Sequence, residues 1–357
     1  MIAKTITAEE LGALVADLVS AGTRVIAPAR AADGKVDYRA ITRFEEAAIG
    51  AELPRRSLKE FFLPPTEPLF SWHQGKGDVT VKPVAVSFPP HVVLGARPCD
   101  AAAVEILDRV MGWDYRDELW FGRREATTIV SVACPGVDGS CFCTATGGGP
   151  DSKRGSDLMM VPVDGGYLVE AVTPKGQAFV GAHAARFVDA ADAGTTAAAE
   201  AFRTGVRSRV AEHLTLSLPA LRRWLEGSFD HELWRAIVLR CHGCGACASV
   251  CPTCHCFDIV DEPEGVRAGT RRRNWDTCQT ARFTVHASGH NPRADQNARF
   301  RQRVLHKFSI YPGRFGEVLC TGCGRCARAC PGGMDLPEVL KTITALVGTG
   351  ASREAAV

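Results

Sequence analysis

The sequence lacks several features that would assign it to a common functional class. Its 42 lysine and arginine residues nearly balance 40 aspartate and glutamate residues, so the net charge of +2 favours neither nucleic acid nor a membrane surface. No apolar run reaches the length of a membrane span. The opening residues, MIAKTITAEELGAL, show no secretory or twin-arginine signal. We therefore expect no membrane span, no nucleic-acid partner and a cytoplasmic location.

Motifs for nucleotide binding and for hydrolysis are also missing. No Gly-x-Gly-x-x-Gly follows a strand-like segment, and no Walker A loop is present. No His-Glu-x-x-His motif or Ser/His/Asp arrangement stands out. These absences indicate a chain that does not itself convert a two-electron substrate.

Cysteine, in contrast, is abundant. The chain of 357 residues holds fifteen cysteines, and eleven of them lie after residue 230. They fall in runs of short spacing, in a long chain with no predicted secretory signal. This pattern favours metal ligation in a reducing compartment over a disulfide framework.

Two stretches repeat one cysteine pattern. CHGCGACASVCP begins at Cys241 and CTGCGRCARACP begins at Cys320, and they agree at eight of twelve positions. Both read C-x2-C-x2-C-x3-C-P, the bacterial ferredoxin spacing for [4Fe–4S] clusters, in which the fourth cysteine usually ligates the other cluster. Structural zinc sites usually pair two C-x2-C knuckles instead. The predicted ligand sets are Cys241, Cys244, Cys247 and Cys330 for one cluster, and Cys320, Cys323, Cys326 and Cys251 for the other.

Four further cysteines predict a third [4Fe–4S] cluster, with zinc as the main alternative. They are Cys99, Cys134, Cys141 and Cys143, in GARPCDAAA and ACPGVDGSCFCTATGGGP. Cys99 and Cys134 each end a segment that reads as a buried strand, and open α/β sheets build sites beyond the carboxyl ends of strands. Four cysteines in two short loops exceed what core packing alone explains.

Three cysteines remain unassigned: Cys254, Cys256 and Cys278. A further ligand such as His255 or Asp276 would let them hold a metal. They would serve equally well as packing residues beside the clusters.

The pattern of elements predicts an α/β N-terminal domain over residues 1–215, followed by a mostly α-helical dicluster ferredoxin-like domain over 216–357 with an insertion at 257–315. Strand-like and helix-like segments alternate in the first part, which favours a mostly parallel sheet. The residues from Arg267 to Arg314 include eleven basic and two acidic residues. This stretch would offset cluster charge, dock an acidic partner or form a solvated surface.

The sequence resembles one family along most of its length. The stretches that show this resemblance are both cysteine motifs, GARPCDAAAVEILDRV, CPGVDGSCFCTATGGGP and NWDTCQTARFTVHASGHNPR. They resemble the iron–sulfur beta subunit of cytoplasmic NAD(P)-linked nickel–iron hydrogenases (sulfhydrogenases), a family that includes the corresponding iron–sulfur protein of anaerobic sulfite reductase. The resemblance implies a role in electron transfer within a complex and supports ligand roles for the twelve cysteines assigned above.

The sequence therefore predicts an iron–sulfur subunit without a catalytic site of its own, in a hetero-oligomeric oxidoreductase. Two or three [4Fe–4S] clusters would pass electrons between an NAD(P)H-linked flavoprotein and a catalytic subunit of hydrogenase or sulfite-reductase type. One alternative is a zinc-stabilised scaffold or nucleic-acid adaptor. Another is a self-sufficient reductase acting at the Cys99 site.

Overall fold

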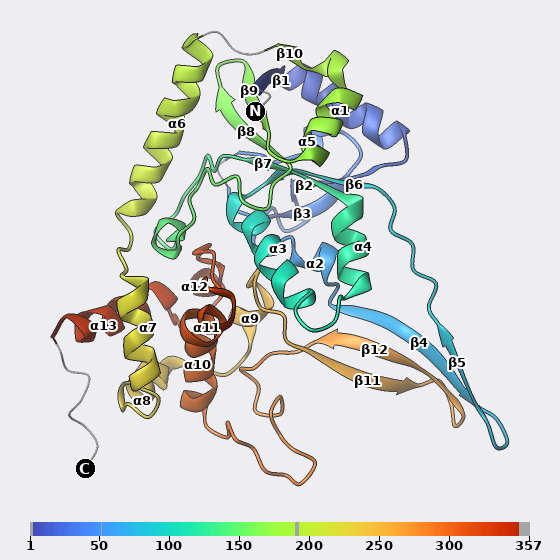
Figure 1. The fold of residues 1–357 in the computed structure, drawn as a ribbon, viewed down its shortest axis with the longest axis vertical. Helices are drawn as coiled ribbons and strands as arrows, with labels where there is room; N and C mark the ends of the chain where they lie inside the picture. Colours follow the sequence, from blue (N-terminus) through green and yellow to red (C-terminus); the bar gives the residue numbers. More distant parts are fainter. Residues whose placement is uncertain (1–2, 51, 190–192, 350–357) are drawn as a thin grey trace.

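The computed structural model describes residues 3–50, 52–189 and 193–349. The chain up to Ala211 builds an eight-stranded sheet covered by helices, and the chain after it consists of helices and one β-hairpin (Figure 1). The strand order is β10-β1-β9-β8-β7-β6-β2-β3. The strands are β1 Ala3–Thr7, β2 Arg24–Arg30, β3 Val36–Ile41, β6 His91–Ala96, β7 Thr127–Val132, β8 Leu158–Val163, β9 Gly166–Ala171 and β10 Val188–Asp189.

The sheet is parallel only at its centre. Strands β2, β6, β7 and β8 pair in parallel, whereas β3, β9, β1 and β10 join antiparallel. The tight turn at Asp164 and Gly165, where Gly165 has φ of +78°, connects β8 to β9 and can only produce an antiparallel neighbour. The α/β class predicted for this part is confirmed, with a sheet that is mixed instead of mostly parallel.

Apolar residues on both faces of the sheet pack against the surrounding helices. Val25 and Ala27 of β2 face one core together with Leu11 and Leu14, and Ile26 between them faces the other. This alternation is what a strand buried on both sides requires. The helices are α1 Ala8–Ser20, α2 Lys59–Phe62, α3 Pro98–Met111, α4 Glu118–Ala126, α5 Pro174–Ala182 and α6 Ala193–Ala211.

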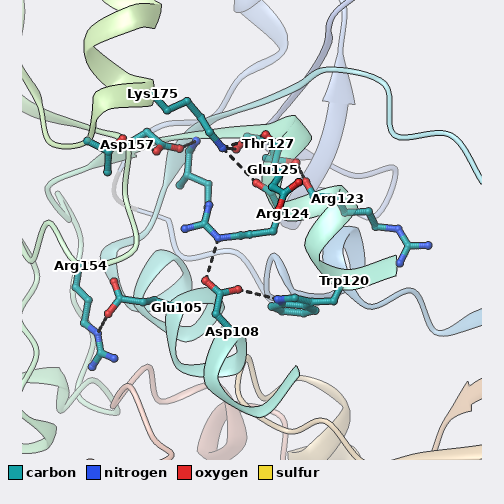
Figure 2. Close-up of polar contacts among 12 residues, drawn as sticks. Glu105, Asp108, Trp120, Arg123, Arg124, Glu125, Thr127, Arg154, Asp157 and Lys175 are labelled. Atoms are coloured by element: carbon teal, nitrogen blue, oxygen red, sulfur yellow. Dashed lines mark hydrogen bonds and ion pairs between the residues drawn. The ribbon is translucent and has the colours of Figure 1, made fainter. Parts of the chain in front are cut away.

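The start of α3 positions a candidate ligand. Arg97 is the residue that precedes the helix, and Pro98 occupies the first turn, where a missing N–H costs nothing. Cys99 therefore lies in the first turn of α3, directly beyond β6. Figure 2 shows how the far end of α3 is held: Asp108 Oδ1 accepts from Trp120 Nε1 at 2.7 Å and Asp108 Oδ2 accepts from Arg124 Nε at 3.2 Å, both from α4.

A second sheet joins distant parts of the chain. Its order is β11-β12-β4-β5, all antiparallel, with bounds β4 Thr66–Gln74, β5 Val79–Pro83, β11 Phe257–Pro263 and β12 Ala268–Trp275. It extends away from the larger sheet (Figure 1). The hairpin of the predicted insertion thus pairs with a strand of the first region.

The remaining C-terminal residues form helices around an apolar core that includes Trp224, Trp234, Phe308 and Leu340. A π-helical turn, His306–Ile310, continues directly from α10. Within the described ranges, no helix is long and apolar enough to cross a membrane. The helices are α7 Leu218–Gly227, α8 Leu233–Ile237, α9 Ala246–Ser249, α10 Gln296–Leu305, α11 Tyr311–Phe315, α12 Arg325–Arg328 and α13 Leu336–Thr349.

Candidate iron–sulfur cluster sites

The four thiols predicted for the first ferredoxin cluster line one cavity. This cavity is lined by Cys241, Cys244, Cys247 and Cys330, and also by Cys326 of the second predicted set. The motif loop reaches this shape through glycine: Gly243 and Gly245 have φ of +67° and +77°. A Cβ on Gly245 would lie 2.6 Å from Thr277 Cγ2. Other residues rarely adopt this backbone, so the loop depends on glycine both for its turn and for its close packing.

The second predicted set is also brought together, across the two motifs. Cys251 of the first motif lies near enough to Cys320 and Cys326 of the second to act on their pKa values. Burial raises the pKa of Cys320 to about 11 and that of Cys326 to about 12. Such thiols would stay protonated near neutral pH, and a ligated iron would favour their thiolate form. The arrangement fits a cluster that bridges the motifs.

The four N-terminal cysteines line a separate cavity, together with Arg97 and Cys323. We call it the third cavity, because it corresponds to the third predicted cluster. Cys99 follows β6 and Cys134 follows β7, and these strands are parallel neighbours. Cys141 and Cys143 come from the adjacent loop and the 3-10 turn that begins at Cys143. The expectation that these thiols gather at one sheet edge is met. Their role as ligands remains a prediction, as it does for the two ferredoxin sets.

Arg97 supplies a test of whether this third cavity suits a cluster. Its side chain is fully buried, and Nη2 donates to the carbonyl oxygens of Gly50 and Glu52 at 2.5 and 2.8 Å. Nε and Nη1 have no hydrogen-bond partner among the described residues. Burial raises the pKa of Cys134, and the positive charge of Arg97 opposes that rise. A buried cation with free donors requires an anion, and cluster thiolates and sulfides would provide one.

The third cavity and the second motif are packed against each other. Phe142 N donates to Gly322 O at 2.8 Å, and a Cβ on Gly322 would lie 2.5 Å from backbone atoms of Cys143. Arg325 of α12 forms a two-pronged ion pair with Asp100 of α3, at 2.8 and 2.7 Å, with both side chains almost completely buried. The two candidate cluster sites are therefore held at a fixed separation.

Arg154 forms a further link between α3 and the residues that precede the second motif. Arg154 Nε donates to Glu105 Oε1 of α3 at 2.8 Å, as Figure 2 shows, and Nη2 donates to Glu317 Oε1 at 2.9 Å. Glu317 stands three residues before Cys320, and Arg154 follows the glycine-rich loop after Cys143. The chain thus fixes both cysteine-bearing loops relative to α3.

The basic stretch from Arg267 to Arg314 includes two contrasting structural groups. Arg271 and Arg272 of β12 form exposed or half-exposed ion pairs with Asp261 and Glu262 of β11. Arg303 and Lys307, by contrast, are buried. Burial alone would lower their pKa values, but nearby thiols, chiefly Cys247 for Arg303 and Cys251 for Lys307, raise them above the usual values. The explanation that basic residues offset cluster charge fits this second group only.

Sequence reasoning missed the buried lysine of the N-terminal region. Lys59 of α2 reaches the first motif, where Nζ donates to Ser249 O at 3.4 Å, and it also donates to Cys254 O, two residues after the motif, at 3.0 Å. Lys307 Nζ lies 3.4 Å from Cys251 Sγ. The only available signal was the place of Lys59 in an apolar segment, SLKEFFLPP, which does not specify its partner.

No group of three or more His, Cys, Asp or Glu side chains within residues 3–50, 52–189 and 193–349 is arranged around a single metal ion. All fifteen cysteines are unpaired thiols. A [4Fe–4S] cluster spreads its four thiolates over separate irons, so the observed groups of thiols around cavities suit it better than they suit zinc.

Two comparisons with known proteins bear on these sites. Residues 240–334 match the family model described as a 4Fe-4S dicluster domain. Sulfhydrogenase 2 subunit beta of Pyrococcus furiosus is 29% identical over 317 residues, which cover 87% of this chain and 91% of that protein. The first match spans both ferredoxin motifs, and the second extends far beyond them into the α/β region.

Proposed function

From the premise that the chain belongs to the family of iron–sulfur beta subunits represented by this sulfhydrogenase, we propose that it relays electrons inside a multi-subunit oxidoreductase. One end of the relay would be an NAD(P)H-linked flavoprotein subunit. The other would be a catalytic subunit of hydrogenase or sulfite-reductase type. A reducing cytoplasm suits a chain whose fifteen cysteines are all unpaired thiols.

The observation that carries the proposal is the close packing of three groups of thiols. Cys251 joins the two ferredoxin groups, and the contact of Gly322 with Cys143 joins the second group to the third. Each [4Fe–4S] cluster held there would accept and release one electron at a time. The protein residues hold the thiolates in place, exclude water and supply the positive charge of Arg97, Arg303 and Lys307.

Metal analysis of the anaerobically purified full chain tests the proposal. Changing Cys244→Ser, Cys323→Ser or Cys141→Ser should each remove about four iron and an equal amount of sulfide, because each thiol serves a different [4Fe–4S] cluster. Ser140→Ala, next to Cys141 but without a thiol to lose, is the matched control and should keep all iron. A colourless protein with zinc and no reducible centre would contradict the proposal.

Co-purification distinguishes the possible catalytic partners. The chain is expressed with its native neighbours, and bound metals are measured after anaerobic isolation. Nickel in the complex indicates a hydrogenase partner, whereas sirohaem indicates a sulfite-reductase partner. Flavin in the same complex is expected in both cases.

A self-sufficient reductase is a second candidate, favoured by one cavity. A cavity of about 780 Å³ lies beside the Cys99 site and shares Leu53, Val137, Arg325 and Arg328 with it. Lys35, Arg55 and Arg56 add positive charge to its wall. Its volume is that of a small-molecule site. Turnover of sulfite by the isolated chain with a viologen donor would favour this candidate. Absence of turnover would favour the electron relay instead.

A further inference from the structure

Three cysteines outside the proposed relay are brought together by the second sheet. The β11–β12 ladder pairs Phe257 with Trp275, and one step further Asp276 N donates to Cys256 O at 3.0 Å. Just beyond this end of the hairpin, the side chains of Cys256 and Cys278 lie close enough for each thiol to shift the pKa of the other. Cys254, two residues before Cys256, lies close enough to raise the pKa of the Cys256 thiol. Residues 22 positions apart in the chain thus meet at one place.

Buried positive charge surrounds this group of thiols. Arg303 Nη1 donates to Cys254 Sγ at 3.3 Å, and Lys59 Nζ donates to Cys254 O and lies 3.9 Å from the ring centre of Trp275. Both side chains are buried, at 3% and 5% exposure. In the part of the chain that the structure describes, neither forms an ion pair with a carboxylate. Buried cations of this kind need anionic partners, because burying an unpaired charge is costly.

The two ferredoxin clusters do not account for this site by themselves. Their eight thiolates are already assigned, and the thiols that raise the pKa of Lys59 are Cys254 and Cys256, which belong to neither, as well as Cys251. His255 does not complete a mononuclear zinc site. Among the described residues, no three His, Cys, Asp or Glu side chains are arranged around a single metal ion, and the His255 ring packs on His306.

Resting on the proposed function, we propose that Cys254, Cys256 and Cys278 ligate an additional [4Fe–4S] cluster. Three irons would carry cysteine thiolates, and the fourth would carry a non-cysteine ligand such as water or a small anion. All fifteen cysteines would then be iron ligands: eight in the ferredoxin pair, four at the Cys99 site and three here.

Contacts on both sides place this site within the relay. Cys254 lies close enough to Cys251, a ligand predicted for the second ferredoxin cluster, for each thiol to shift the pKa of the other. Gln279 Nε2 donates to Cys278 Sγ at 3.5 Å, and Gln296 Nε2 donates both to Gln279 Oε1 at 3.4 Å and to Cys241 Sγ at 3.2 Å. The site is therefore adjacent to both ferredoxin clusters and gives the relay a branch with an exchangeable iron.

Iron and sulfide counts on the full chain, isolated anaerobically with co-expressed cluster-assembly proteins, provide the test. The wild type should hold about sixteen iron, and Cys256→Ser with Cys278→Ser should lower this to about twelve, since one [4Fe–4S] cluster is lost. Thr280→Ala, close to Cys278 but without a thiol, should keep all of it. Cys99→Ser should also lose about four iron but remove a different component of the reduced-state EPR spectrum.

The wild type alone can overturn the inference even if the variants fold poorly. About twelve iron in a fully loaded wild type, or one zinc that disappears in the double variant, contradicts the additional cluster. Cyanide, which binds an exchangeable iron, should alter one EPR component of the wild type, and an unaltered spectrum counts against the open iron. If Cys244→Ser and Cys323→Ser leave the iron content unchanged, the proposed function itself has failed, which is a separate outcome.

Discussion

The two cysteine-rich regions neutralise buried positive charge in different ways. At the Cys99 site, Arg325 is paired with Asp100 inside the protein, and Arg97 alone has free donors. Around the ferredoxin motifs, Lys59, Arg303 and Lys307 are all buried, and thiols and backbone carbonyls are their partners. The first site is largely neutral before any cluster binds. The second has three cations that only anionic clusters can neutralise, so its folding should depend far more on cluster insertion.

The largest expected effect comes from removing the clusters. Without them, Lys59, Arg303 and Lys307 lose their anionic partners, which should cost several kcal/mol for each buried ion. Hydrogen exchange on iron-loaded and iron-free chains should show lost protection from α7 to α13, with the eight-stranded sheet still protected. Equal loss in both regions would refute the difference proposed here.

Breaking the internal ion pair at the Cys99 site should have the next largest effect. Asp100→Asn leaves Arg325 buried without its countercharge, and we expect a loss of about 3–5 kcal/mol in unfolding free energy. Asp138→Asn is the control, because its partner Arg328 is partly exposed. Such a pair contributes less than about 1 kcal/mol. Urea unfolding of the iron-loaded variants measures both, and similar losses would contradict the assignment.

Acid should weaken the ferredoxin region through His306. Burial lowers the pKa of His306 from 6.5 to about 3, so the unfolded chain binds this proton more readily than the folded chain. The stabilisation is therefore complete above pH 6.5 and is lost as the pH falls toward 3. Between pH 7 and pH 5 the loss should be about 2 kcal/mol. Denaturation of His306→Gln should show a weaker pH dependence than the wild type in this interval; an identical dependence would exclude His306 as its source.

The smallest predicted effect is a change in reduction potential. Arg97→Gln removes the positive charge facing the third cavity, which should disfavour the reduced, more negative cluster by about 1 kcal/mol. For one electron this corresponds to a potential lowered by tens of millivolts. EPR-monitored redox titration should show the shift in the component that Cys99→Ser removes. Arg303→Gln should instead shift the ferredoxin components, and a shared shift would mean that the two sites are not electrostatically separate.

Local sequence patterns were sufficient to identify most of the candidate ligands. The ferredoxin spacing is contained in twelve residues, and Cys99 and Cys134 follow strands whose apolar runs are easily recognised. The cap of α1 is likewise local, because Thr7 Oγ1 accepts a hydrogen bond from Glu10 N, three residues further on, at 3.2 Å.

Features that depend on distant partners could not be predicted in this way. The ion pair of Asp100 with Arg325 joins residues 225 positions apart, and that of Glu67 with Arg273 joins residues 206 apart. The β4–β12 pairing leaves no mark in either segment alone, so the predicted insertion gave no sign that it would extend a sheet of the first region. Spacing within a motif is a local property, whereas charge neutralisation and sheet pairing are properties of the whole fold.

The β4–β12 pairing also sets an order of events during synthesis. Glu67 leaves the ribosome 206 residues before Arg273, the residue that it pairs with. At about 5–20 residues per second, β4 waits roughly 10–40 s for its neighbour. The first ferredoxin motif emerges before β12, so its cysteines are accessible to cluster-assembly proteins while this edge of β4 is still open. Completion of the small sheet would then close the region around Cys254, Cys256 and Cys278 only after these cysteines had been open to iron delivery.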